Sequence, residues 1–273
     1  MQAFHPNGII TLLTDFGTDS FYVAEMKGAI LGIAPRANLV DVTHGVKPQQ
    51  VAEGSWKLLR AVEAFPPGTI HVAVVDPGVG SNRPILIAQV AEQMVIGPDN
   101  GLLEIVAARH TPRGVWRVKL EVFPATERFH TFHGRDVMAP AAARLVKGEA
   151  ISHFSENLPV ASILDAASKL RLAHHEGDTV TGRVVYADSF GNLITNIMVD
   201  DIPANWEPKR LTVELGTTSI DGLSRTYSQA PEGEWAALWG SSGQLELAVV
   251  RGNAAQRCGA WEGAQVKVSR LTE

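Results

Sequence analysis

The chain has 273 residues, of which 45% are hydrophobic and 19% are charged, and its formal net charge at pH 7 is -5. This length and composition indicate one or two globular domains with a substantial core and exclude a disordered or fibrous chain. A negative net charge without a cluster of Lys or Arg argues against a nucleic-acid binder, so the expected partner is a small molecule.

The single cysteine, Cys258, excludes an intrachain disulfide and a zinc site built from cysteines. The segment 1–17 has no basic stretch followed by an apolar one, and nowhere do about eighteen consecutive apolar residues occur. We therefore expect a cytoplasmic protein that makes no contact with a membrane.

The first half of the chain alternates short apolar runs with amphipathic segments. Residues 8–13 are typical of a buried strand, and residues 21–33 follow with apolar side chains at helical spacing. Further strands are predicted at 38–42, 69–75, 85–90, 93–97 and 115–120, and further helices at 51–65, 102–109 and 137–147. This alternation predicts an α/β fold with a mainly parallel sheet, in which functional groups lie in loops at the strand ends.

The pattern changes near Asp178, where helical periodicity gives way to short alternating segments. These segments predict strands of a small barrel or sandwich at 179–188, 192–197, 210–216, 234–239, 244–250 and 264–270. We place the boundary within residues 171–178, which gives an N-terminal domain of residues 1–172 and a C-terminal domain of residues 178–273.

Asp15 follows the first predicted strand and precedes Gly17. Ligands of open α/β sheets bind at that end of a strand, and a carboxylate there can accept hydrogen bonds from both hydroxyls of a ribose. The alternative is that Asp15 only stabilises a turn or caps the next helix.

The stretch VVDPGVGSNR, residues 74–83, places Asp76 and Arg83 on the two arms of a glycine-rich loop. Asp before Pro-Gly is also what a tight turn prefers. The Gly-x-Gly within the loop is a weak phosphate signal, because neither the dinucleotide fingerprint nor a Walker lysine accompanies it.

His133 stands just before a predicted helix, with Asp136 as the expected cap. The partial positive charge of a helix N-terminus lowers the pKa of a nearby histidine and favours neutral imidazole, although a single histidine is often only a packing residue. His130 and His133 form an H-x-x-H pair, but no further ligand motif accompanies it, so we expect no metal.

Two turns in the second half carry further candidates. Asp188, Phe190 and Asn192 share a hairpin-like turn in which an aromatic face beside an amide could stack on a base and bond to its edge. Ser241 and Ser242 could hold a carboxylate or an amine, or could simply form a turn, and they do not fit the G-x-S-x-G elbow of serine hydrolases.

The order of these motifs carries more information than any one of them. They run TDFGT-D, VVDPGVG-x-x-R, GPDNG, FHGRD-x-x-AP, D-x-FGN-x-x-TNI and SSG-x-LE-A. From Ile9 to Ala255 the chain resembles the S-adenosyl-L-methionine (SAM) hydrolase (adenosine-forming) family. Its members are also called SAM hydroxide adenosyltransferases, and they are related to the SAM-dependent fluorinase and chlorinase.

The resemblance implies an N-terminal α/β domain, a C-terminal β-barrel, and a homotrimer with SAM bound between the N-domain of one subunit and the C-domain of the next. It implies that SAM is the substrate, that adenosine and L-methionine are the products, and that no cofactor is needed. The implied catalytic residues are Asp76, Arg83 and His133. The implied binding residues are Asp15 for the ribose, Phe190 and Asn192 for the adenine, Asp188, Ser241 and Ser242 for the methionine portion, and Glu246 and Val249 as further contacts. The fluorinase has Arg where this chain has Ser242, so the mode of carboxylate recognition is open.

In the implied reaction, water or hydroxide attacks C5′ of SAM and methionine leaves as a neutral thioether, so no general acid is needed. Asp76 and His133 are the candidate proton acceptors, and Arg83 would stabilise a hydroxide-like oxygen and keep Asp76 ionised. One alternative is halide transfer to the same carbon, which a carboxylate in the nucleophile's pocket disfavours. Another is a SAM- or adenosine-binding protein without turnover.

Overall fold

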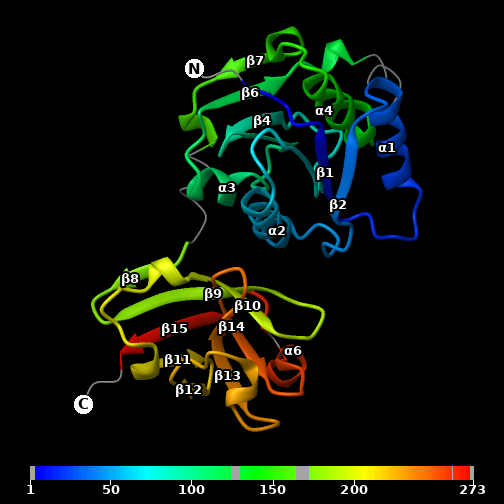
Figure 1. Cartoon of the computed structure of the whole chain (residues 1–273). Helices are drawn as coiled ribbons and strands as arrows, with labels where there is room; N and C mark the ends of the chain where they lie inside the picture. Colours follow the sequence, from blue (N-terminus) through cyan, green and yellow to red (C-terminus); the bar gives the residue numbers. More distant parts are fainter. Residues whose placement is uncertain (1–3, 124–129, 164–171, 260, 271–273) are drawn as a thin grey trace. The chain divides into compact units, whose positions relative to one another are not determined.

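The computed structural model describes residues 4–123, 130–163, 172–259 and 261–270. Contacts within the chain divide it into two compact units, Met1–Leu170 and Arg171–Glu273 (Figure 1). The exact limits predicted for the two domains, residues 1–172 and 178–273, stay a prediction.

The first unit is built on a seven-stranded sheet in the order β2-β1-β3-β5-β4-β6-β7. The strands are β1 (Ile9–Thr14), β2 (Asn38–Thr43), β3 (Ile70–Val74), β4 (Ile85–Val90), β5 (Gln93–Pro98), β6 (Gly114–Val118) and β7 (Ser155–Leu158). From β2 to β5 the neighbours are parallel. From β5 to β7 they are antiparallel. The predicted α/β class is therefore confirmed, with the parallel strands gathered in one half of a mixed sheet.

The change of direction between β4 and β5 comes from a two-residue turn. Ala91 and Glu92 both have positive φ, 45° and 63°. That conformation matches a tight hairpin, which joins antiparallel neighbours without a crossover helix. The sequence pattern predicted both strands. It did not predict the hairpin, because the turn has neither Gly nor Asn.

Helices cover both faces of this sheet (Figure 1). They are α1 (Tyr22–Ile33), α2 (Val51–Ala64), α3 (Glu104–Arg109) and α4 (Ala139–Val146), the last preceded by a π-helical segment, η3 (Gly134–Met138). Helices α1 and α4 pack together over Ile10, Leu12 and Val72. On the opposite face Gln93 donates to the carbonyl oxygen of Val62 in α2 at 2.8 Å. Short one-turn 3₁₀ segments, η1 (Leu120–Val122) and η4 (Ile151–His153), complete the unit.

The second unit is an antiparallel barrel, which confirms the predicted all-β class. Its strands are β8 (His174–Glu176), β9 (Thr179–Ala187), β10 (Leu193–Met198), β11 (Leu211–Leu215), β12 (Thr218–Asp221), β13 (Trp235–Trp239), β14 (Gln244–Val249) and β15 (Gln265–Arg270). They run in the order β12-β11-β15-β9-β10-β14-β13, and β8 pairs with β9. The N–H of Ser224 donates to the carbonyl oxygen of Ala237 in β13 at 2.8 Å and brings the two ends of the sheet together.

Short helical segments occupy the connections of the barrel. They are η5 (Val199–Asp201), η6 (Pro208–Arg210), η7 (Tyr227–Gln229) and α6 (Ala254–Cys258). Asn253 caps α6 by accepting from the N–H of Gln256 at 2.8 Å. Within the described residues no helix has the length and hydrophobicity needed to cross a bilayer.

The register of the parallel strands positions the first candidate residues. Thr14 at the end of β1 lies beside Val74 at the end of β3. Because both strands run in the same direction, the residues that follow them, Asp15 and Asp76, emerge at the same edge of the sheet.

Candidate functional site

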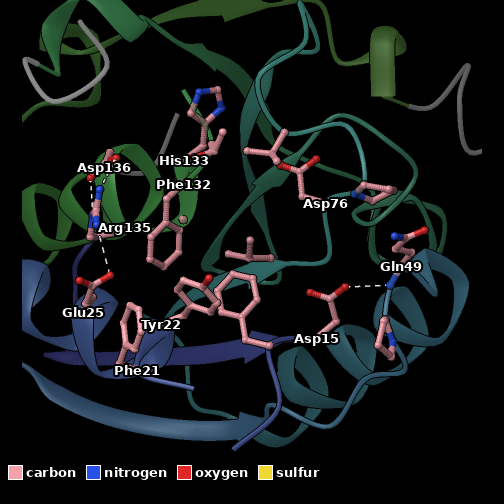
Figure 2. Close-up of a pocket in the computed structure, with 17 residues that line it drawn as sticks. Asp15, Phe21, Tyr22, Glu25, Gln49, Asp76, Phe132, His133, Arg135 and Asp136 are labelled. Atoms are coloured by element: carbon pink, nitrogen blue, oxygen red, sulfur yellow. Dashed lines mark hydrogen bonds and ion pairs between the residues drawn. The ribbon is translucent and has the colours of Figure 1, made fainter. Parts of the chain in front are cut away.

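A pocket of about 1060 Å³ opens at this edge (Figure 2). Its lining comes from the loops after β1, β2 and β3, from the start of α1, and from the segment that leads into η3. The lining residues are Asp15, Phe16, Phe21, Tyr22, Glu25, Pro48, Gln49, Val74, Asp76, Pro77, Val79, Thr131, Phe132, His133, Gly134, Arg135 and Asp136. Three residues singled out from separate parts of the sequence, Asp15, Asp76 and His133, thus share one cavity.

Arg83 joins Asp76 to His133. Its Nε donates to Oδ1 of Asp76 at 2.6 Å, and its Nη2 donates to Oδ2 of the same carboxylate. The same Nη2 lies 3.2 Å from Nδ1 of His133. The side chains of Arg83 and Asp76 are 8% and 5% exposed. A two-pronged ion pair at this burial is rigid, because the guanidinium fork matches the carboxylate geometry.

The contact with Arg83 defines the protonation state of His133. A guanidinium only donates, so Nδ1 must accept and the ring proton of the neutral imidazole is on Nε2. Burial lowers the pKa of His133 below its usual value, and the positive charge of Arg83 lowers it further. This is the direction predicted from the sequence, with burial as the main cause.

The predicted helix cap at Asp136 is wrong. Asp136 lies inside η3, where Arg135 donates from Nε to Oδ1 at 2.6 Å and from Nη2 to Oδ2 at 2.9 Å. The position before η3 is occupied by His133, whose side chain makes no capping bond. Asp136 instead forms an ion pair with Arg135. The preference of aspartate for helix caps does not predict this ion pair.

The H-x-x-H pair does not form a recognisable metal centre. His130 is exposed and His133 is buried. Among the described residues, no group of three or more His, Cys, Asp or Glu side chains has an arrangement suited to a metal ion.

The GPDNG motif holds both arms of the loop that carries Asp76 and Arg83. Nδ2 of Asn100 donates to the carbonyl oxygen of Val75 at 2.9 Å, just before Asp76. The N–H of Asp99 donates to the carbonyl oxygen of Pro84 at 3.0 Å, just after Arg83. The sequence alone assigns no role to this motif. Its role in holding the loop depends on the position of β5 beside β3 and β4.

One glycine of the loop is required by its conformation. Gly80 has a φ of 82°, and a Cβ there would lie 2.9 Å from the carbonyl oxygen of His130. Any other residue would combine left-handed strain with a backbone clash, so this glycine shapes the loop and need not bind phosphate.

Asp15 is fixed by a neighbouring loop. Its Oδ2 accepts a hydrogen bond from the N–H of Gln49 at 2.8 Å (Figure 2). Gln49 has a φ of 66°, an uncommon value for a residue other than glycine. Sequence reasoning missed Gln49, because the bond uses its backbone and a side-chain motif carries no such signal.

Aromatic rings form another wall of the pocket and were also missed. Phe16, Tyr22 and Phe132 make mutual edge-to-face contacts, with ring centroids 5.2–5.6 Å apart. Phe21 adds a ring that is 65% exposed. Beside this wall Arg135 lies 5.0 Å from the Phe132 centroid and bridges to Glu25 at 3.2 Å (Figure 2).

In the second unit, Asp188 organises the turn between β9 and β10. Its Oδ1 accepts from the N–H groups of Phe190 and Asn192, both at 2.9 Å. Its Oδ2 accepts from Nδ2 of Asn192 at 3.0 Å. The Phe190 ring projects from this turn and is 77% exposed, although large aromatic side chains usually bury their rings.

The remaining candidates lie on β14 and on the turn before it. Ser242 donates to Oε1 of Gln244 at 3.3 Å, and Ser241 is exposed. Glu246 is 8% exposed and accepts from the hydroxyl of Tyr227 at 2.5 Å. Burial raises the pKa of Glu246, and the nearby charge of Asp188 raises it further.

Val249, the last of the predicted contacts, is 7% exposed within the barrel core. Its side chain packs against Gly252, where a Cβ would lie 2.6 Å from Cγ1 of Val249. Its role as a ligand contact stays a prediction.

The chain combines an α/β unit, which carries a buried Asp–Arg–His group at a pocket, with an antiparallel barrel. Comparison with known proteins identifies this two-domain architecture. Residues 10–155 match the SAM hydroxide adenosyltransferase N-terminal domain, and residues 182–267 match the C-terminal domain of the same family. The chain belongs to the SAM hydroxide adenosyltransferase family.

Individual relatives agree with this assignment. The chain is 34% identical to an (R)-S-adenosyl-L-methionine hydrolase of Thermus thermophilus over 95% of this chain and 98% of that protein. A Fluorinase of Actinoplanes sp. is 29% identical over 72% of this chain and 74% of its own. The crystal structure of an uncharacterized conserved protein from Thermotoga maritima superposes with a TM-score of 0.84, at 32% identity, covering 96% of this chain and 100% of that one.

Proposed function

We propose that this protein hydrolyses SAM to adenosine and L-methionine by attack of water at C5′ of the ribose. The observation that carries the proposal is the Asp76–Arg83–His133 group at the pocket of the first unit. A SAM-binding protein without turnover has no use for a buried, two-pronged ion pair joined to a neutral histidine.

The chemistry requires activation of the nucleophile. The oxygen of water forms a bond to C5′, the C5′–S bond breaks, and its electron pair neutralises the sulfonium, so methionine needs no proton on leaving. His133 already carries its proton on Nε2 and can donate to the water, whereas Asp76 can accept the proton that the water loses. Arg83 donates one hydrogen bond to each carboxylate oxygen of Asp76 and so leaves one lone pair on each oxygen for this task.

Substrate recognition is divided among the other candidates. Asp15 accepts hydrogen bonds from the ribose hydroxyls, Phe190 stacks on the adenine, and Asn192 forms a hydrogen bond with the edge of the adenine. The Asn192 amide N–H is held by Asp188, which directs Oδ1 to serve as the acceptor for an adenine amino group. Asp188, Ser241 and Ser242 serve the methionine portion, with Glu246 and Val249 as additional contacts.

Three further parts complete the proposal. No cofactor takes part, since a sulfonium is a sufficient leaving group. The protein is a homotrimer whose sites combine the N-terminal unit of one subunit with the C-terminal unit of the next, and it acts in the cytoplasm. The exposed rings of Phe21 and Phe190 support a site completed by another surface, because both are large apolar groups open to solvent.

Incubation of the purified protein with SAM in ¹⁸O-labelled water tests the reaction directly. The expected result is adenosine with the label in its 5′-oxygen, together with methionine. We expect Asp76→Asn to reduce the rate by about 10²–10⁴-fold, the usual contribution of a positioned proton acceptor.

The same assay separates the alternatives. Formation of 5′-halo-adenosine in the presence of halide would assign the protein to halide transfer. Binding of SAM without turnover would leave only a binding function, and unlabelled adenosine would exclude attack by water.

A further inference from the structure

We propose that Asp41, His44 and Thr14 form a positioning relay that orients Asp15 for the ribose hydroxyls. The inference rests on the proposed function of the pocket and adds residues that do not line it. Asp41 and His44 stand outside the motifs quoted from the sequence, and Thr14 is the first residue of TDFGT-D.

The relay is a chain of side-chain contacts that runs from β2 to the end of β1. Nε2 of His44 lies 3.1 Å from Oδ1 of Asp41, and Nδ1 of His44 lies 2.9 Å from Oγ1 of Thr14. Thr14 is fully buried, and the side chain of His44 is 8% exposed. Asp41 is itself anchored to α1 by Lys27 at 2.6 Å.

The donors and acceptors along this chain have a single consistent direction. Within the described part of the chain, Nε2 of His44 makes no hydrogen bond of acceptable geometry, so its contact with Asp41 is electrostatic. The negative charge of Asp41 favours the ring proton on Nε2, and in that tautomer Nδ1 accepts from the Thr14 hydroxyl. Oγ1 of Thr14 then accepts from the N–H of Phe16 at 3.2 Å. The relay therefore ends on the residue after Asp15 and passes through the residue before it.

Backbone bonds from the same segment complete the hold on Asp15. The carbonyl oxygen of His44 accepts from the N–H of Gly17 at 2.8 Å, and the N–H of Val46 donates to the carbonyl oxygen of Thr14 at 3.4 Å. The N–H of Gln49 reaches the Asp15 carboxylate itself at 2.8 Å. The segment that follows β2 thus contacts Asp15 and both flanks of its loop.

This arrangement suits a carboxylate that must accept two hydroxyls at once. A carboxylate in an open pocket can rotate. It can accept hydrogen bonds from two neighbouring hydroxyls only if both of its oxygens keep their orientation. Gln49 holds the strained backbone conformation that places its N–H against Asp15, and such strain persists where the surrounding structure enforces it.

The test uses adenosine and 2′-deoxyadenosine as probes, titrated calorimetrically into the full-length protein. Thr14→Val keeps the shape of the side chain but removes the hydroxyl, whereas Thr14→Ser keeps the hydroxyl. We expect Thr14→Val to reduce the affinity for adenosine about tenfold and the affinity for 2′-deoxyadenosine far less, so the preference for the diol collapses. Thr14→Ser should retain that preference.

A second pair of variants serves if Thr14→Val does not fold. The amide of Asn reproduces the Nδ1 position of histidine, and that of Gln reproduces the Nε2 position. His44→Asn can still accept from Thr14 and should keep the preference for adenosine, whereas His44→Gln reaches only Asp41 and should lose it. His153→Gln, at a histidine whose side chain is 66% exposed, is the control.

The outcomes are distinct. If Thr14→Val and His44→Gln weakened the affinity for adenosine and the affinity for 2′-deoxyadenosine equally, the relay would have only a general structural role. That result would overturn the inference. A wild-type protein that does not distinguish the two nucleosides would remove the ribose function of Asp15 and the relay with it. Failure of SAM turnover with intact discrimination would count against the proposed function alone.

Discussion

The imidazole of His133 is neutral for two physical reasons, burial and the adjacent Arg83 cation, and the second can be removed by substitution. We predict that Arg83→Met raises the pKa of His133, because the repulsion from the guanidinium disappears and the charge of Asp76 then favours imidazolium. An NMR titration of the His133 ring protons measures the shift.

The control is Arg117→Met, which removes a surface arginine that pairs with Glu156. It should leave the His133 titration unchanged. An unchanged or lowered His133 pKa in Arg83→Met would mean that Arg83 does not set the protonation state of His133, and the assigned tautomer would have to be abandoned.

Phe190 offers a residue-scale prediction about binding. Its ring is 77% exposed, so Phe190→Ala removes little packing and should leave Tm almost unchanged. If the ring stacks on adenine, the loss is about 1–3 kcal/mol, and KM for SAM should rise by about 5–150-fold. Val199→Ala, at an apolar side chain that is 44% exposed in the same unit, is the control and should change neither value. An unchanged KM in Phe190→Ala would exclude the stacking role.

At the scale of elements, the strand β3 carries a buried polar side chain that makes its stability depend on pH. His71 is fully buried, and its Nδ1 lies 2.7 Å from Oγ1 of Thr11 on β1. Its Nε2 contacts Oε1 of Gln93 on β5. Burial lowers the pKa of His71 from 6.5 to about 4.

The sign of the effect follows from this shift. Between pH 6.5 and about 4 the unfolded chain binds a proton on His71 that the folded chain does not, so the free energy of unfolding decreases as the pH falls. The contribution of His71 amounts to about 3 kcal/mol at most. Urea unfolding of the wild type and His71→Gln across this range should show a steeper loss in the wild type, whereas the exposed control His153→Gln should follow the wild type. Parallel curves for His71→Gln and the wild type would contradict the assignment.

At the scale of the whole molecule, the proposed trimer predicts complementation between two variants that are both impaired when the SAM concentration is below KM. Asp76→Asn disables the N-terminal part of a site and Phe190→Ala weakens the C-terminal part. If each site draws on two subunits, mixed trimers of equal proportions contain about a quarter of their sites with both parts intact. The rate of SAM hydrolysis in co-expressed, co-purified mixtures measures this.

The matched control is a mixture of the two proteins purified separately and not allowed to exchange subunits. Activity that never exceeds the sum of the two variants would place each site within one subunit. Sedimentation of the wild-type protein as a monomer would exclude the trimer directly.

Much of the architecture could be predicted because it depends on local patterns. The alternation of apolar runs and amphipathic segments predicted the α/β unit, and the period-two segments after Asp178 predicted the barrel. The direction of β4 could not be predicted, because Ala91 and Glu92 adopt positive φ without the Gly or Asn that normally reveals a hairpin. The helix α6 was missed as well, since a five-residue helix carries too little periodicity.

The sequence by itself determined which residues are candidates for the chemistry, since Asp15, Asp76, Arg83 and His133 stand in motifs that a single chain displays. The tertiary structure decided how these candidates are held, because hydrogen bonds between distant strands and loops depend on packing that no local pattern records. It gave His133 its tautomer through Arg83, replaced the expected cap at Asp136 by an ion pair with Arg135, and placed Gln49 against Asp15. A backbone N–H or a buried histidine becomes functional only when the fold brings its partner within about 3 Å, and that distance is a property of the folded chain.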